Sequence, residues 1–144
     1  MAMVRFEFDI EPVEQARPRA VRFGTGVRMY DPKKVAIFKR QLGMLAKQQM
    51  IDRGLDPYDG PLEVRMEFYR PVQSSISNKE RARRLSGVHR PTVKPDLDNY
   101  IKSTSDALNG IIWADDNLIV SLEAKKFYSE QPHLMVEVRR PTCS

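Results

Sequence analysis

The sequence between residues 94 and 110 reads KPDLDNYIKSTSDALNG, and its apolar spacing predicts a helix from Leu97 to Asn109. One face of this helix is apolar and is formed by Leu97, Ile101, Thr104 and Leu108. Asp98, Lys102 and Asp106 recur at every fourth position and form a charged stripe away from that face. The helix is therefore expected to pack by its apolar face and to leave the charged stripe free.

The segments on both sides of this helix predict the rest of the fold. Alternating apolar and polar residues predict strands over residues 4–10, 62–69, 118–128 and 134–139. A long helix is expected to about Arg53, with Asp31 as its N-cap and Pro32 as its first residue. Residues 11–30 look irregular, and the last two strands, joined at Pro132, are expected to pair as an antiparallel hairpin. The order β-α-β-(basic insert)-α-β-β predicts one α+β domain with a mixed sheet over the whole 144-residue chain.

The basic insert lies between Arg70 and Lys94 and carries a net charge of +6, whereas the whole chain carries +5. Its seven basic residues are Arg70, Lys79, Arg81, Arg83, Arg84, Arg90 and Lys94. Ser77 and Glu80 have the spacing of a capping box, which predicts a short helix to about Leu85. Such a patch is either a surface for a polyanion or a solvated loop, and charge alone does not separate the two.

Two acidic pairs lie on either side of the central helix. Asp96 and Asp98 are at its start, and Asp115 and Asp116 open the following strand. Taken singly, these residues could be helix caps, ordinary ion pairs with Lys102, or a turn. Four carboxylates without a cationic partner would repel one another, however, and a divalent cation would supply the missing charge. We therefore expect the strand after Asp116 to return alongside the helix and bring the two pairs together.

This arrangement suits phosphodiester hydrolysis. Mg²⁺ held by carboxylates can activate water and stabilise the charge of the transition state. Lys102 lies one turn from Asp98, where its ammonium group could contact the scissile phosphate, although an ion pair with Asp98 or Asp106 is the plainer interpretation. Trp113 is expected to be a core or loop anchor rather than a base-stacking residue.

Other site chemistries and a membrane location are not favoured. His89 and His133 are the only histidines, and Cys143 is the only cysteine, so a metal here should be a hard cation bound by oxygen. The chain contains no apolar run long enough to span a membrane and no recognisable signal peptide. With one thiol, a reducing cytoplasm is the expected compartment.

A series of motifs contains the charged stripe and the residues on both sides of it: Lys94-Pro95-Asp96-Leu97-Asp98-Asn99, Lys102, Asp106-Ala107-Leu108-Asn109-Gly110, Trp113 and Asp115-Asp116-Asn117-Leu118-Ile119. In these motifs the chain resembles the RusA family of Holliday junction resolvases, and its basic insert resembles that of phage and prophage members. The resemblance implies that Asp96, Asp98 and Asp116 are essential acids, that Lys102 is the catalytic lysine, and that Asp115 supports the site or the metal. It also implies a homodimeric endonuclease that uses Mg²⁺, with Mn²⁺ as a substitute, to cut four-way DNA junctions in recombination and repair.

Three other functions stay open from the sequence. The chain could be a Mg²⁺-dependent nuclease on other branched or flapped DNA, a non-catalytic DNA-binding module, or an RNA-processing nuclease. Charge alone assigns the remaining candidate DNA contacts, which are Arg17, Arg19, Arg81, Arg83, Arg84, Arg90 and Lys94.

Overall fold

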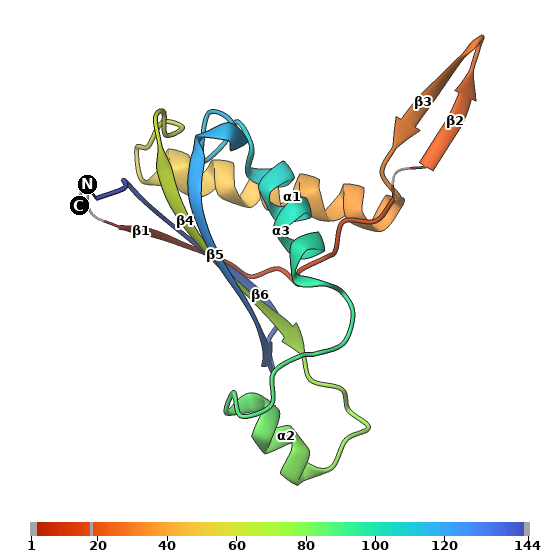
Figure 1. The fold of residues 1–144 in the computed structure, drawn as a ribbon, viewed down its shortest axis with the longest axis vertical. Helices are drawn as coiled ribbons and strands as arrows, with labels where there is room; N and C mark the ends of the chain where they lie inside the picture. The colour runs from red at the N-terminus through yellow and green to blue at the C-terminus, as the bar shows by residue number, and fades with distance from the viewer. Residues whose placement is uncertain (1–2, 18, 143–144) are drawn as a thin grey trace.

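A mixed four-stranded sheet forms the centre of the fold in the computed structural model, which describes residues 3–17 and 19–142 (Figure 1). Its strands are β1 (Val4–Phe8), β4 (Leu62–Pro71), β5 (Ile119–Ser129) and β6 (His133–Arg139). They are arranged in the order β1-β6-β4-β5, with β4 and β5 parallel and the other pairs antiparallel. The predicted α+β class with a mixed sheet is confirmed. Cys143 and the first two residues, which entered the sequence predictions, lie outside the described residues.

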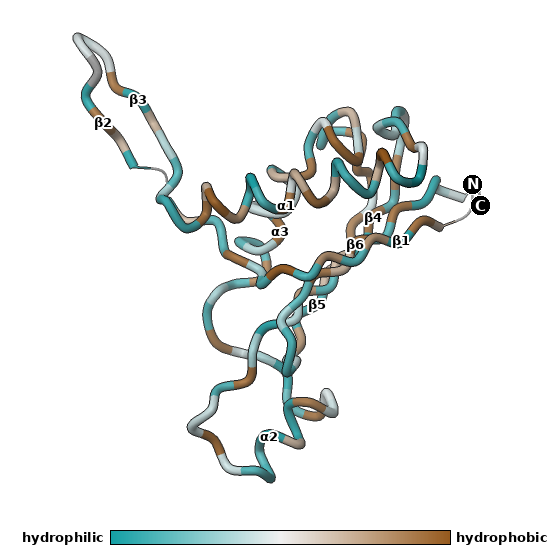
Figure 2. Tube along the Cα trace, turned by 180° about the vertical axis from the view of Figure 1, so that it is seen from behind, coloured by the Kyte–Doolittle hydropathy of each residue, from teal (hydrophilic) through white to brown (hydrophobic). Residues whose placement is uncertain are grey.

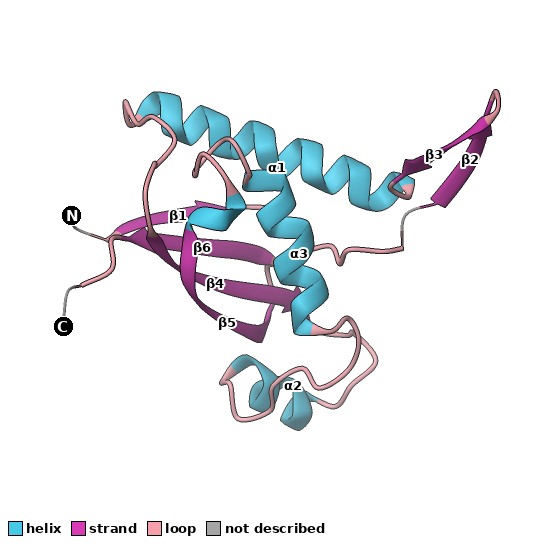
Figure 3. Cartoon of the chain, turned by 45° about the horizontal axis from the view of Figure 1, so that its top comes forward, coloured by secondary structure: helices cyan, strands magenta, loops and turns pink. Residues whose placement is uncertain are grey.

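Two helices cover one face of this sheet, α1 (Lys33–Asp52) and α3 (Leu97–Leu108) (Figure 3). Between them and the sheet lies a core that includes the fully buried Phe6, Phe68 and Trp113. The helices meet closely at Gly43 of α1, where a Cβ atom would lie 3.4 Å from the Ala107 carbonyl oxygen of α3. α1 and α3 are thus positioned as one layer over the sheet.

The predicted hairpin of the last two strands is wrong. β5 and β6 are not neighbours, because β4 lies between them and pairs with both. β6 is a central strand in which Leu134 to Val138 are all buried, whereas β5 is an edge strand. The unit β4–α3–β5 is consequently a parallel crossover, in which α3 runs back along the sheet between two parallel strands.

Residues 11–30, expected to be irregular, contain a second sheet. β2 (Arg19–Phe23) and β3 (Gly26–Tyr30) form an antiparallel hairpin that projects from the body beyond the start of α1 (Figures 1 and 2). α1 begins two residues after Asp31, and Asp31 does not cap it: Pro32 holds the N-cap position without a side-chain hydrogen bond. The carboxylate of Asp31 instead binds Gln15 and Lys39.

The basic insert forms α2 (Asn78–Leu85) at the opposite end of the molecule from the hairpin (Figure 1). The Ser77 side chain accepts a hydrogen bond from the Glu80 amide at 3.1 Å, which confirms the predicted N-cap. A short 3₁₀ helix, η1 (Asp116–Leu118), precedes β5. Across the described residues, no helix combines the length and the apolar character needed to cross a bilayer.

Candidate functional site

α3 presents three of the predicted site residues to solvent. Asp96 occupies its N-cap position, but the Asp96 side chain makes no capping hydrogen bond. Asp96, Asp98 and Lys102 are all exposed, and their charged groups form no hydrogen bond or ion pair with any other described residue. The alternative interpretations of Asp96 as a side-chain cap and of Lys102 as an ion-pair partner are therefore not supported.

Asp115 and Asp116 lie at the other end of α3. The Trp113 indole N–H donates to Asp116 Oδ1 at 2.6 Å, and the Asp116 amide donates to the Asn109 side chain at 2.9 Å. Burial raises the pKa of Asp116, with smaller contributions from the Asp106 and Asp115 carboxylates, while the indole hydrogen bond acts in the opposite direction. Trp113 is fully buried, which confirms its prediction as an anchor, and it fixes the orientation of the Asp116 carboxylate.

The two acidic pairs do not meet within one chain. α3 starts near the end of β4 and finishes near the start of β5. Because β4 and β5 are parallel, the two ends of α3 lie near opposite ends of these strands. Eleven positions of helix separate Asp98 from Asn109, the partner of Asp116, which corresponds to about 16 Å. Within residues 3–17 and 19–142, no three His, Cys, Asp or Glu side chains are placed to hold one metal ion. The expectation that the following strand brings the pairs together is wrong for the single chain.

Lys39 on α1 is a residue of this surface that sequence reasoning missed. Its ammonium group donates to Asp106 Oδ2 at 2.6 Å and to Asp31 Oδ2 at 2.8 Å. Asp106 is thereby paired with Lys39 rather than with Lys102, four residues away on the same helix. Lys39 and Asp106 are 67 positions apart, so no local spacing could have indicated the pair.

A groove of about 520 Å³ lies beside the exposed stripe of α3. It is lined by Gln15, Ala16, Arg17, Asp31, Lys39, Asn99, Lys102 and Asp106. Within it Lys39 is neutralised by two carboxylates, whereas Arg17 and Lys102 have no partner among the described residues. The groove therefore presents two free cations next to the helix that carries Asp98, which is the charge needed to accept a phosphate group.

The candidate DNA contacts divide into two groups. Four of them have exposed side chains that bind no other described residue, and these are Arg17, Arg19, Arg83 and Lys94. The other three, Arg81, Arg84 and Arg90, are already engaged in contacts within the protein. The side chains of the first group have all their donors free for a phosphate group, whereas those of the second group have only part of theirs.

The engaged arginines hold the insert against the sheet. Arg84 pairs with Glu80 at 3.0 Å and stacks over the Tyr128 ring. Arg90 lies 4.0 Å above the centre of the Phe127 ring, and its Nε donates to the Lys126 carbonyl. Arginines of the basic insert, one in α2 and one after it, thus contact the end of β5.

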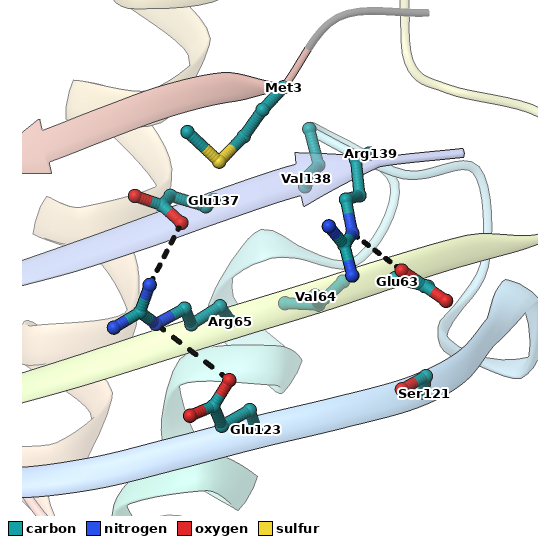
Figure 4. Close-up of a pocket in the computed structure, with 9 residues that line it drawn as sticks. All are labelled: Met3, Glu63, Val64, Arg65, Ser121, Glu123, Glu137, Val138 and Arg139. Atoms are coloured by element: carbon teal, nitrogen blue, oxygen red, sulfur yellow. Dashed lines mark hydrogen bonds and ion pairs between the residues drawn. The ribbon is translucent and has the colours of Figure 1, made fainter. Parts of the chain in front are cut away.

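The uncovered face of the sheet holds a hollow of about 150 Å³, in which acids and bases compensate each other (Figure 4). Arg65 on β4 lies between Glu123 and Glu137, at 3.9 and 3.8 Å, and Arg139 pairs with Glu63 at 2.5 Å. Because each of these cations faces a carboxylate, this face offers little attraction to a polyanion, and we place the candidate site on the helical side.

Two comparisons with known proteins establish the family of the chain. The sequence model of the family described as endodeoxyribonuclease RusA matches residues 9–139. The chain is 39% identical over 141 residues to YqaN of Bacillus subtilis (strain 168), itself uncharacterized, and the match covers 96% of this chain and 97% of that protein. The chain belongs to the RusA family of endodeoxyribonucleases.

Proposed function

We propose that the protein is a Mg²⁺-dependent endonuclease that resolves Holliday junctions by paired, symmetric nicks, acting as a homodimer in DNA recombination and repair in the cytoplasm. The observation that carries this proposal is the set of unpaired charges on α3, where Asp96, Asp98 and Lys102 share one exposed surface. Family membership supports the cleavage of DNA.

The carboxylates at both ends of α3 are suitable ligands for Mg²⁺. Mg²⁺ prefers carboxylate oxygens and is commonly held by one or two carboxylates together with water and substrate phosphates. Asp96 and Asp98 offer oxygens with no other described partner, and Asp116 has one oxygen that the Trp113 hydrogen bond does not use. When bound, the metal would activate water and stabilise negative charge on the phosphate.

The remaining site residues would bind and orient the substrate. Lys102, one turn beyond Asp98, carries a free ammonium group that can neutralise a non-bridging phosphate oxygen. Arg17, across the groove, can hold a phosphate of the same strand. Trp113 keeps the Asp116 carboxylate in one orientation through its indole N–H.

The separation of the acids favours a site built from two chains. Asp98 of one copy and Asp116 of another can approach each other across a two-fold axis, whereas within one chain about 16 Å of helix separates Asp98 from Asn109, the residue that binds the Asp116 amide. A two-fold dimer would then hold two equivalent sites. A four-way junction offers two symmetry-related strands, so such a dimer matches the substrate.

The test compares substrates and metals. The wild-type protein is incubated with a four-way junction, a flapped duplex, a linear duplex and single strands, in Mg²⁺, Mn²⁺ or EDTA. Symmetric cuts in the junction that require Mg²⁺ or Mn²⁺ support the proposal. Preferential cutting of the flapped duplex would assign a different branched substrate, and binding without cutting in either metal would make the protein a non-catalytic DNA-binding module.

A further inference from the structure

The hairpin β2–β3 has no buried side chain among its described residues, and its charge has one sign. Residues 16–30 contain four arginines and no acidic residue. Every described side chain of the two strands is exposed, including Val27 at 70% and Met29 at 59%. A two-stranded ribbon without a buried face is only marginally stable in water, so a surface that covers it would contribute to its order.

The arginines lie on both faces of the ribbon. Arg28 lies directly opposite Val21, and Val21 points to the same face as Arg19, two positions earlier in β2. Arg19 and Arg28 therefore share one face. Arg22 lies opposite Val27 on the other face. Like charges on neighbouring strands repel each other when no acid separates them, and a polyanion between or beside them removes that repulsion.

The root of the ribbon is fixed to the helix that carries the candidate site. The Gln15 side chain, ahead of β2, donates to Asp31, which follows β3, at 3.0 Å, so the two ends of the hairpin are tied together. The Gln15 backbone N–H donates to the Asn99 carbonyl of α3. Lys39 binds both Asp31 and Asp106, and Asp106 belongs to the same helix. The orientation of the ribbon is therefore coupled to the position of α3.

We infer that the β2–β3 ribbon is a DNA-binding arm that contacts backbone phosphates of the duplex flanking the cut, an inference that rests on the proposed function. Five residues per strand extend about 17 Å from the root, which spans about five base pairs. A two-stranded ribbon also fits the width of the major groove of B-DNA. A second copy of this chain is the other surface that could cover the ribbon, but four uncompensated arginines favour a polyanion.

The experiment measures binding of a four-way junction in EDTA, where no cleavage occurs, over a range of salt concentrations. The arm variant is Arg22→Gln/Arg28→Gln. Its matched control is Arg40→Gln/Lys47→Gln, which removes the same charge from exposed, unpaired positions of α1. We expect the slope of log affinity against log salt to decrease by about two in the arm variant and affinity at low salt to fall on the order of tenfold. The control should retain the wild-type slope, and so should Arg22→Lys/Arg28→Lys.

Phosphate ethylation interference locates the contacts. Wild type should show interference at flanking phosphates that the arm variant lacks, while interference at the scissile phosphate persists in both. Equal slopes for the arm and control variants would overturn the inference. It would also be overturned if the arm variant dissociated into monomers by light scattering, because the ribbon would then be a contact between copies. If the wild-type protein itself does not bind the junction, the proposed function is refuted instead.

Discussion

Asp98 and Asp116 carry similar carboxylates in different surroundings. The Asp98 side chain is exposed and bonded to no described residue, whereas Asp116 is partly buried and held by Trp113 and Asn109. Burial of Asp116 raises its pKa, so the protein holds a carboxylate where its ionised form is disfavoured. Titratable groups whose pKa is shifted by their surroundings are common at functional sites.

Replacing Asp98 with Asn should abolish cleavage and leave the rest of the protein unchanged. Asn keeps the shape of the side chain but removes the charge that would hold Mg²⁺, so we expect a loss of at least about 100-fold in cleavage rate. Because the Asp98 side chain is exposed and forms no hydrogen bond or ion pair with the described residues, the free energy of unfolding should change by less than about 0.5 kcal/mol. Cleavage, junction affinity and thermal unfolding are measured together.

The control for this variant is Asp56→Asn, an exposed acid in the turn before β4. It removes the same charge from an exposed position that is not part of the proposed site, and this variant should cut junctions at the wild-type rate. Normal cleavage by Asp98→Asn would mean that Asp98 is only a surface residue at a helix start, and the proposed metal site would have to exclude it.

Residues of α3 could be predicted from the sequence because their arrangement is local. A spacing of four fixes Asp98, Lys102 and Asp106 on one exposed stripe whatever the rest of the chain does. Their partners could not be predicted in the same way. Asp106 binds Lys39 on another helix, and the two acidic pairs depend on which strands are neighbours.

At the scale of elements, the helices and strands with a buried face were predicted and the exposed ribbon was missed. Hydrophobic periodicity indicates a strand only when one of its faces packs against something, and every described side chain of β2–β3 is exposed. The order of β5 and β6 was missed for a related reason. The run Leu134-Met135-Val136 is buried on both faces because β6 is central, a feature that alternation alone does not reveal.

Lys39 joins three elements, and removing its charge should weaken their contact in a pH-dependent way. We expect Lys39→Met to lower the free energy of unfolding by about 1 kcal/mol at neutral pH, because two charge-assisted hydrogen bonds are lost at a partly exposed site. The Lys39 hydrogen bond lowers the pKa of Asp31 below its ordinary 3.8, against the effect of burial. Burial alone would lower the pKa of Lys39, but its bonds to Asp106 and Asp31 outweigh burial and raise it above 10.5.

The sign of the pH effect follows from these shifts. A lowered carboxyl pKa stabilises the fold above pH 3.8 and ceases to do so as the pH falls below that value. A raised lysine pKa stabilises the fold below pH 10.5 and ceases to do so above it. The stability difference between wild type and Lys39→Met should thus be constant near neutral pH and shrink at both extremes. Thermal unfolding from pH 2.5 to 11 measures it, with Lys47→Met as control; a difference that persists at pH 2.5 would mean that Lys39 acts through packing.

At the scale of the whole molecule, charge is distributed between two faces of different character. The open face of the sheet pairs its arginines with glutamates, as Arg65 and Arg139 illustrate. The helical side holds the free Arg17 and Lys102. The β2–β3 hairpin projects beyond the start of α1, one of the two helices on this side (Figure 1). A polyanion is therefore expected to cross the helical side, next to α3, while the sheet face is left to solvent.

The separation of the acidic pairs leads to a test on mixed dimers. If each site combines Asp98 of one chain with Asp116 of the other, a dimer of one Asp98→Asn chain and one Asp116→Asn chain retains one complete site and one site lacking both acids. Each variant alone should be inactive, but mixed dimers, isolated through two different affinity tags after co-expression, should nick a single strand of the junction. Mixed dimers of two wild-type chains carrying the same tags serve as the control and should make paired cuts. If the mixed variant dimers do not nick while the control cuts, each site is contained in one chain, and α3 would have to rearrange on binding DNA to bring its two ends together.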